Sequence, residues 1–102
     1  MYAKATQFRF RPDTTAEATR IIHDIMIPSA SKQQGFKGAF MLRHDNDPDN
    51  HIVISLWESK ADLQASRPPE EIVPLLAPLD GYIVEVEQDT CDVLFALYNN
   101  ER

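Results

Sequence analysis

Hydrophobic and polar residues alternate along several segments of the chain, which is the pattern of β-strands with one face against a core. The alternation is clearest in residues 2–11, where Phe8 and Phe10 fall on one side and Gln7 and Arg9 on the other. The same period predicts strands over residues 36–44, 51–58 and 82–88, and the apolar segment 91–98 is expected to form an extra strand or to extend the last one.

Helical spacing of apolar residues separates the first strand from the second. Thr14 opens a T-x-x-E capping box that ends at Glu17, which predicts a helix start at this point. Apolar residues then recur at helical spacing over residues 18–26. Because proline cannot continue a helix without strain, Pro28 predicts that the helix ends or kinks near Ile27, with at most one further turn.

A second, shorter helix is expected after the third strand. Ser59 followed by Asp62 is a helix N-cap, and the two consecutive prolines at 68 and 69 must stop the helix. Two more prolines in residues 70–79 allow at most a helical turn or two. The polar residues 45–50 indicate a loop, so the strands on either side of it should form an antiparallel hairpin.

The order of elements is therefore β-α-β-β-α-β, which predicts one α+β domain over residues 1–102, with residues 91–102 as a C-terminal extension. This ferredoxin-like arrangement places both helices on one face of an antiparallel sheet. The other face is bare, although in the third strand both faces are largely apolar and need cover. A second copy would supply it, so we expect a homodimer packed sheet to sheet, with residues 93–98 as an arm onto the partner. In the third strand we expect Ile52, Ile54 and Leu56 to face the helices. Val53, Ser55 and Trp57 would then face away from them.

Composition narrows the classes of partner. A net charge of −6 disfavours nucleic acid and anionic membranes, because both bind basic surfaces. The single cysteine, Cys91, excludes an internal disulfide and any CxxC motif. No apolar run approaches the ~20 residues of a membrane helix, and Met1–Lys4 does not begin a signal peptide. We therefore expect a cytoplasmic protein.

Three stretches of the chain carry a resemblance to a known family. They are FRFRP at Phe8–Pro12, QGFKGA at Gln34–Ala39 and ISLWESKADL at Ile54–Leu63. Together they make the chain similar to the antibiotic biosynthesis monooxygenase (ABM) domain of the dimeric α+β barrel superfamily. The last stretch is the most specific, and residues 91–102 lie beyond the similarity.

The resemblance implies the fold and the dimer more firmly than it implies the chemistry. Some members oxidise quinols or polycyclic anthrones with O₂ and without metal or flavin, and others degrade haem. The haem-degrading branch needs an asparagine on the first strand and a histidine on the side of the second helix. Here Thr6 takes the first position and residues 59–80 contain no histidine, so we expect neither haem nor any other cofactor.

Trp57 is the first candidate site residue. A lone tryptophan at the end of a strand can fill the core, or its ring can form a cavity wall that stacks on a flat aromatic substrate. The resemblance carries Trp57 over as a residue that lines the pocket. Both interpretations stay open at this point.

Gln7 and Arg9 are the polar candidates on the first strand. If the two phenylalanines of that strand face the helices, Gln7 and Arg9 face the cavity and can bind a carbonyl or an anionic oxygen. In the alternative, Arg9 pairs with Glu85 or Glu87 of the fourth strand. If the phenylalanine face points into the cavity, Thr6, Phe8 and Phe10 line it instead.

The remaining candidates would complete an apolar pocket with few polar groups. Val53 and Met41 could supply wall, Ser55 an inward hydroxyl, and Tyr82 the only further titratable group, so a general base is missing. A metal site is not expected. The loop DNDPDN at residues 45–50 lacks the glycine and the glutamate that a calcium loop requires at its sixth and twelfth positions.

The prediction that follows is a cofactor-independent monooxygenase acting with O₂ on a small quinol- or anthrone-like molecule, in a cavity at the sheet interface of the dimer. The alternative is a non-catalytic dimer of the same fold that binds a small apolar or aromatic ligand or only assembles. Isomerase or lyase chemistry also occurs on this barrel and would need an inward acid or base.

Overall fold

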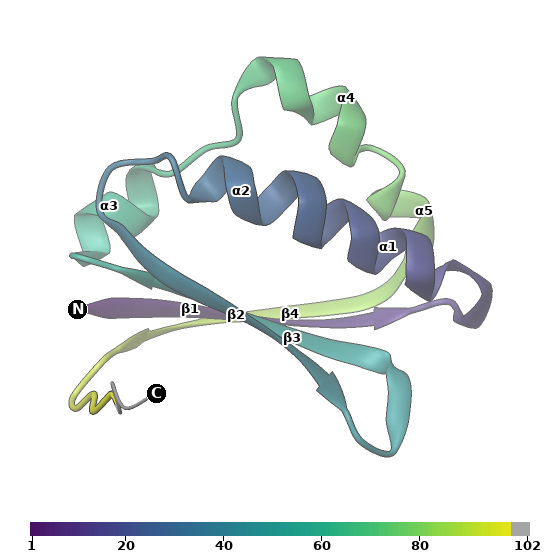
Figure 1. Ribbon diagram of the computed structural model, residues 1–102, viewed down its shortest axis with the longest axis horizontal. Coiled ribbons are helices and arrows are strands. Elements are labelled where there is room, and N and C mark those ends of the chain that lie inside the picture. The colour runs from purple at the N-terminus through teal and green to yellow at the C-terminus, as the bar shows by residue number, and fades with distance from the viewer. Residues whose placement is uncertain (99–102) are drawn as a thin grey trace.

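The computed structural model describes residues 1–98, so the last four residues of the predicted C-terminal extension lie outside the described part of the chain. Four strands form the antiparallel sheet, and their order is β2-β3-β1-β4. The described helices all lie on one face of this sheet, and none of them covers the other face (Figure 1). This is the predicted ferredoxin-like α+β fold. The strands are β1 (Tyr2–Phe10), β2 (Phe36–His44), β3 (Asp47–Trp57) and β4 (Ile83–Asp92), and the helices are α1 (Thr15–Ile21), α2 (Ile27–Ala30), α3 (Lys60–Ala65), α4 (Val73–Leu76) and α5 (Leu79–Tyr82).

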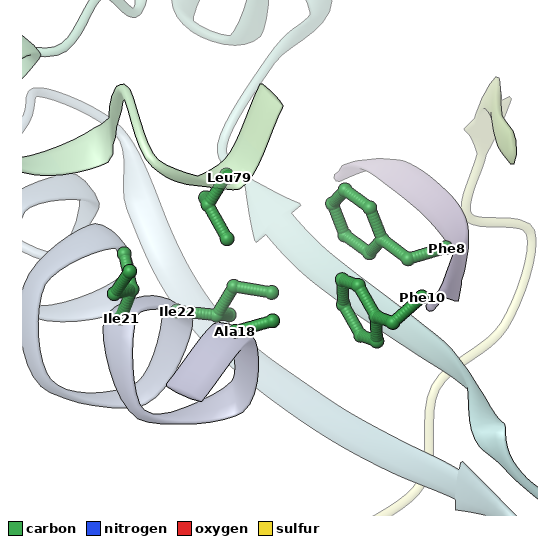
Figure 2. Close-up of a cluster of buried hydrophobic side chains, with 6 residues drawn as sticks. All are labelled: Phe8, Phe10, Ala18, Ile21, Ile22 and Leu79. Atoms are coloured by element: carbon green, nitrogen blue, oxygen red, sulfur yellow. The ribbon is translucent and has the colours of Figure 1, made fainter. Parts of the chain in front are cut away.

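The hydrophobic core lies between the central strand β1 and the helices. Phe8 and Phe10 stack on each other, with ring centroids 5.6 Å apart, and point toward the helix layer (Figure 2). Burial of a large apolar side chain in such a layer contributes about 1.5–3 kcal/mol. The rest of this buried cluster consists of Ala18, Ile21, Ile22 and Leu79.

The first helix changes its geometry just before Ile27 and continues for one further turn, as predicted from its proline. A π-helical turn, Ile22–Met26, joins α1 to α2, and the Ile27 N–H donates to the Ile22 carbonyl five residues back. Pro28 follows this wide turn and lies inside α2. Because proline has no N–H to donate and its ring crowds the carbonyl four residues back, a wider turn just before it lets the chain stay helical.

The two predicted helix caps turn out differently. Ser59 caps α3 as expected, since its Oγ accepts a hydrogen bond from the Asp62 N–H at 3.1 Å. Thr14 stands at the start of α1, but its hydroxyl donates to the Arg11 carbonyl at 2.8 Å and caps nothing. The capping box therefore located the helix start correctly and gave the wrong reason for it.

The hairpin loop is shorter than predicted, because β3 already begins at Asp47. Pairing of β3 with β1 stops at Asn50, opposite Arg9. Pro48 lies beyond that point, where β3 has no β1 neighbour on that side and the missing N–H breaks no ladder bond. The proline-containing segment can therefore continue the strand past the end of β1.

The two faces of β3 were assigned the wrong way round. Thr6 of β1 stands opposite Val53, and directly opposite residues share a face of the sheet. Val53 packs against the core cluster beneath the helices. The set that faces the helices is therefore Val53, Ser55 and Trp57, and the set on the open face is Ile52, Ile54 and Leu56.

The C-terminal segment extends β4 and adds no separate strand within residues 1–98. The strand runs to Asp92, and the Val93 N–H donates one further bond to the Met1 carbonyl at 3.0 Å. Beyond it, Leu94 is 91% exposed and Phe95 is exposed as well. None of the described helices is long and apolar enough to span a membrane.

Candidate functional site

A cavity of about 320 Å³ lies between the helix-facing side of the sheet and the helical layer. Its floor comes from β1, β2 and β3, and its roof from α2 and from the chain between α3 and α4. Most of the lining is apolar. The residues that the argument below uses are Lys4, Thr6, Ser29, Ser55, Trp57 and Arg67.

Trp57 forms a fixed part of the cavity wall. The side chain is only 2% exposed, and its indole N–H donates to the Ser55 Oγ at 3.0 Å. The ring meets Phe36 edge to face, with centroids 5.4 Å apart and an interplanar angle of 89°. A hydrogen bond at one end and an aromatic contact at the other hold the indole in one orientation.

Four hydroxyl groups line this mostly apolar space, and one of them, Ser66, already donates to the Leu63 carbonyl, which leaves three. Ser55 accepts the Trp57 N–H and keeps its own proton free to donate. The Ser29 Oγ is buried and has no hydrogen-bond partner among the described residues. Thr6 is also buried. Because an unpaired buried hydroxyl costs about 1–3 kcal/mol, a ligand oxygen near Ser29 would recover a hydrogen bond that the protein itself does not supply.

One edge of the cavity is fixed by the side chain of Gln33. Its Oε1 accepts the Arg67 N–H at 2.8 Å, and its amide nitrogen donates to the Arg67 carbonyl. This pair ties the turn after α2 to the segment after α3. The position of Arg67 at the cavity edge is therefore set by backbone contacts and does not depend on its charge.

The predicted site residues divide between the two sides of the sheet. Trp57, Ser55 and Val53 line the cavity, although on the helix side of the sheet and not on the open side. Met41 and Tyr82 pack against the core cluster and are absent from the lining.

Gln7 and Arg9 lie on the open face. Gln7 donates to the Asn50 Oδ1 at 3.1 Å. Arg9 lies 2.8 Å from the Asp47 carboxylate and 3.5 Å from that of Glu85, and its hydrogen bond lowers the pKa of the Asp47 carboxyl. The phenylalanines of β1 face the helices and Gln7 and Arg9 face away from them, as the first alternative required, and Arg9 pairs with Glu85 as the second expected. The cavity lies on the helix side of the sheet, so neither Gln7 nor Arg9 lines it.

His51 of β3 is a buried polar residue that was not among the predicted site residues. It is 5% exposed, its ring lies 5.5 Å from that of Phe10, and its Nδ1 has no partner among the described residues. Burial lowers the pKa of His51, and the nearby Arg43 lowers it further. Because His51 borders a separate groove toward α1, it is not part of the lining around Trp57. His51 stands directly opposite Phe8 on the neighbouring strand. That register would have indicated that His51 faces the core.

The cavity is poor in acid–base groups. Within residues 1–98, its only titratable lining side chains are Lys4 and Arg67. Hydroxyl donors therefore outnumber groups that could take a proton at neutral pH. What the arrangement can do chemically is bind a flat apolar molecule, offer hydrogen bonds to its oxygens and keep water away from it.

Comparison with known proteins gives the family. The model of the antibiotic biosynthesis monooxygenase family matches residues 1–72, which span β1 through the turn before α4 and include Trp57. The chain belongs to this family. The resemblance found in the sequence is thereby confirmed. No protein of curated function matches the sequence.

Solved structures of ABM proteins share the fold across nearly the whole chain. SnoaB, a cofactor-independent oxygenase from Streptomyces nogalater, superposes with a TM-score of 0.80 at 14% identity, covering 96% of this chain and 97% of its own. A protein of unknown function from Nitrosomonas europaea gives 0.77 at 17% identity over 98% and 95%. An antibiotic biosynthesis monooxygenase gives 0.77 at 13% identity over 92% and 99%. At such identities the likeness establishes the fold alone.

Proposed function

We propose that this chain is a cofactor-independent monooxygenase that acts on a small quinol- or anthrone-like substrate in the cavity in front of Trp57. Membership of the ABM family and the likeness to SnoaB support the reaction class. The observation that carries the proposal is the cavity itself, whose immobilised indole faces the same space as three hydroxyl groups. Its volume of about 320 Å³ suits a ligand of a few fused rings.

The substrate would supply the electrons for this reaction. An anthrone loses a proton to become an enolate, which reacts with O₂. One oxygen atom ends as the new carbonyl of the product and the other leaves as water. Donors from Ser29 and Ser55 would stabilise the negative oxygen of the enolate, and the apolar walls would exclude water while O₂ reacts. Since no carboxylate or imidazole of the described residues lines the cavity, the proton would leave to water at the cavity mouth.

We further propose that the protein works as a homodimer joined through the open face of the sheet. Phe40 of β2 is 50% exposed on that face, and Leu42 beside it is also exposed. They stand opposite Ile54 and Ile52 of β3, so apolar side chains cover adjacent strands there. A contiguous apolar surface of this kind is typical of an interface.

Oxygen uptake with an anthrone and with a quinol tests the proposed reaction. Trp57→Ala should lower kcat/KM at least about tenfold, because the stacking wall is lost, and Trp57→Phe should lose less. Leu75→Ala is the control, since that leucine is exposed on α4 and is absent from the lining. Wild-type protein that takes up no oxygen with any such substrate, but binds it, would point to the non-catalytic ligand-binding dimer. The observation that favours this second candidate, and that speaks against an isomerase or lyase, is that no carboxylate or imidazole lines the cavity within residues 1–98.

A further inference from the structure

Three basic residues gather where the cavity opens. Lys4 and Arg67 line the main cavity, and both also line a smaller one of about 230 Å³ that adjoins it. Lys60 borders this smaller cavity, where its Nζ lies 5.8 Å from the centre of the Tyr2 ring. The main cavity thus continues into a region that carries three positive charges.

No acid balances these charges within the described residues. Neither lining contains aspartate or glutamate, and none of the three basic side chains takes part in an ion pair over residues 1–98. Some basic side chains elsewhere do pair with acids, as Lys37 does with Glu58 at 2.9 Å, whereas Arg11, Lys32 and Arg43 make no ion pair with the described residues. The chain holds 16 acidic and 10 basic residues. A region with three cations and no acid therefore has the opposite charge to the chain as a whole.

The guanidinium of Arg67 is held with one side free. Its Nη1 donates to the carbonyls of Gln64 and Ser66, at 2.9 and 2.8 Å. The described residues offer no acceptor to Nε and Nη2, which form the side of the group that binds a carboxylate through two parallel hydrogen bonds. Lys4 projects from the same face of β1 as Thr6, beside Ser55 on the neighbouring strand.

We propose that the ligand of this cavity is an aromatic carboxylate, with its ring system against Trp57 and its carboxylate between Lys4 and Arg67. The proposal rests on the ligand site proposed above, but it does not depend on turnover. A carboxylate there would gain charge-assisted hydrogen bonds at the edge of an apolar space, where they are stronger than in open water. Lys60 lies further out and would attract the anion as it approaches.

Fluorescence of Trp57 offers a direct binding test, because it is the only tryptophan in the chain and lies in the cavity wall. The probes are anthraquinone-2-carboxylate and its methyl ester, which share the ring system and differ in charge. We expect the acid to quench with a dissociation constant at least about tenfold below that of the ester, which corresponds to roughly 1.4 kcal/mol. Added potassium chloride should shrink this difference.

The double variant Lys4→Gln/Arg67→Gln should bind the two probes equally and leave the affinity for the ester unchanged. Each single variant should weaken binding of the acid about fivefold. Lys37→Gln is the matched control, because it removes one positive charge outside both linings and should behave like the wild type. Circular dichroism and the urea midpoint confirm that each variant is folded.

Equal affinity of the wild type for acid and ester would overturn the proposal, as would an acid preference that survives in the double variant. Preference for the acid without oxygen uptake from any anthrone would support this inference and contradict the proposed monooxygenase. Oxygen uptake from an anthrone, combined with equal affinities for the acid and the ester, would support the proposed monooxygenase and contradict this inference. The two proposals can therefore fail separately.

Discussion

Gly35, in the turn between α2 and β2, offers the sharpest test of how the end of the cavity is held. Its φ of 82° lies in the left-handed region, and its carbonyl accepts the Glu58 N–H at 2.7 Å. Alanine in that conformation costs about 1 kcal/mol or more. A Cβ on Gly35 would also come within 2.5 Å of the Asp62 Cβ, and closer still to the Asp62 carboxyl group.

That collision cannot be relieved by turning one flexible side chain, because the Asp62 Cβ is fixed to α3. The start of α3 would have to move, and the Ser59 cap, which bonds both the N–H and the carboxylate of Asp62, would weaken. Loss of a helix cap costs about 1 kcal/mol. With the backbone strain, Gly35→Ala should lower the free energy of unfolding by about 2–3 kcal/mol.

Urea denaturation at one protein concentration measures this change through the midpoint, provided that the slope stays constant. Gly81→Ala is the matched control, because no atom lies within 4 Å of an added Cβ and the residue is in α5. The control should be neutral or stabilising by up to about 1 kcal/mol. A loss below about 1 kcal/mol in Gly35→Ala would refute the argument that this glycine locks the turn against α3.

Three further predictions follow from the geometry. Because burial lowers the pKa of His51, the folded protein binds fewer protons there than the unfolded chain, so stability is present above about pH 6.5 and falls as the pH drops below it. His51→Leu should flatten the pH dependence of the urea midpoint between about pH 7.5 and pH 5, and a slope that persists in this variant would contradict the assignment. Ser29→Ala removes a buried hydroxyl without a partner, so it should leave stability unchanged or raise it by up to about 1 kcal/mol while weakening the binding of anthraquinone-2-carboxylate; a clear loss of stability would contradict this. Phe40→Glu on the open face should give the mass of one chain by sedimentation and still quench with that probe, and a persisting dimer would refute the proposed interface.

The elements of this fold were predictable because their signals are local. Alternation across Phe8 and Phe10 identifies β1 from a few neighbouring residues, and the order of elements then restricts the sheet to a familiar arrangement. The Ser59 cap likewise depends only on a residue three positions away. Pro28 likewise marked the place where the helix changes its geometry, because a widened turn lies just before it and the helix ends one turn later.

The faces of β3 were not predictable from the strand itself. Both of its residue sets are largely apolar, so alternation shows that the strand has two faces without showing which one the helices cover. The answer lies in the pairing of Thr6 with Val53, two residues that are far apart in the sequence. Once that register is known, the positions of Trp57 and His51 follow directly.

The positively charged mouth of the cavity could not be predicted from the sequence, for a different reason. Lys4 lies near the start of β1 and Arg67 follows α3, and neither stands in a pattern that marks a site. They meet only because α3 packs against β1. Arg9, the cation that the sequence offered as one candidate, has its charge compensated by Asp47 and Glu85 on the other side of the sheet.

The sheet therefore separates two tasks that the sequence had assigned to a single cavity between protomers. Side chains of one strand alternate between the faces, so the residues that form the ligand cavity and those offered to a partner are interleaved along β3. Ser55 and Trp57 face the helices, whereas Ile54 and Leu56 face the proposed partner. The proposed ligand site is lined by residues of a single chain, so we expect the proposed dimer to act on it by holding β3 and β1 in place from behind.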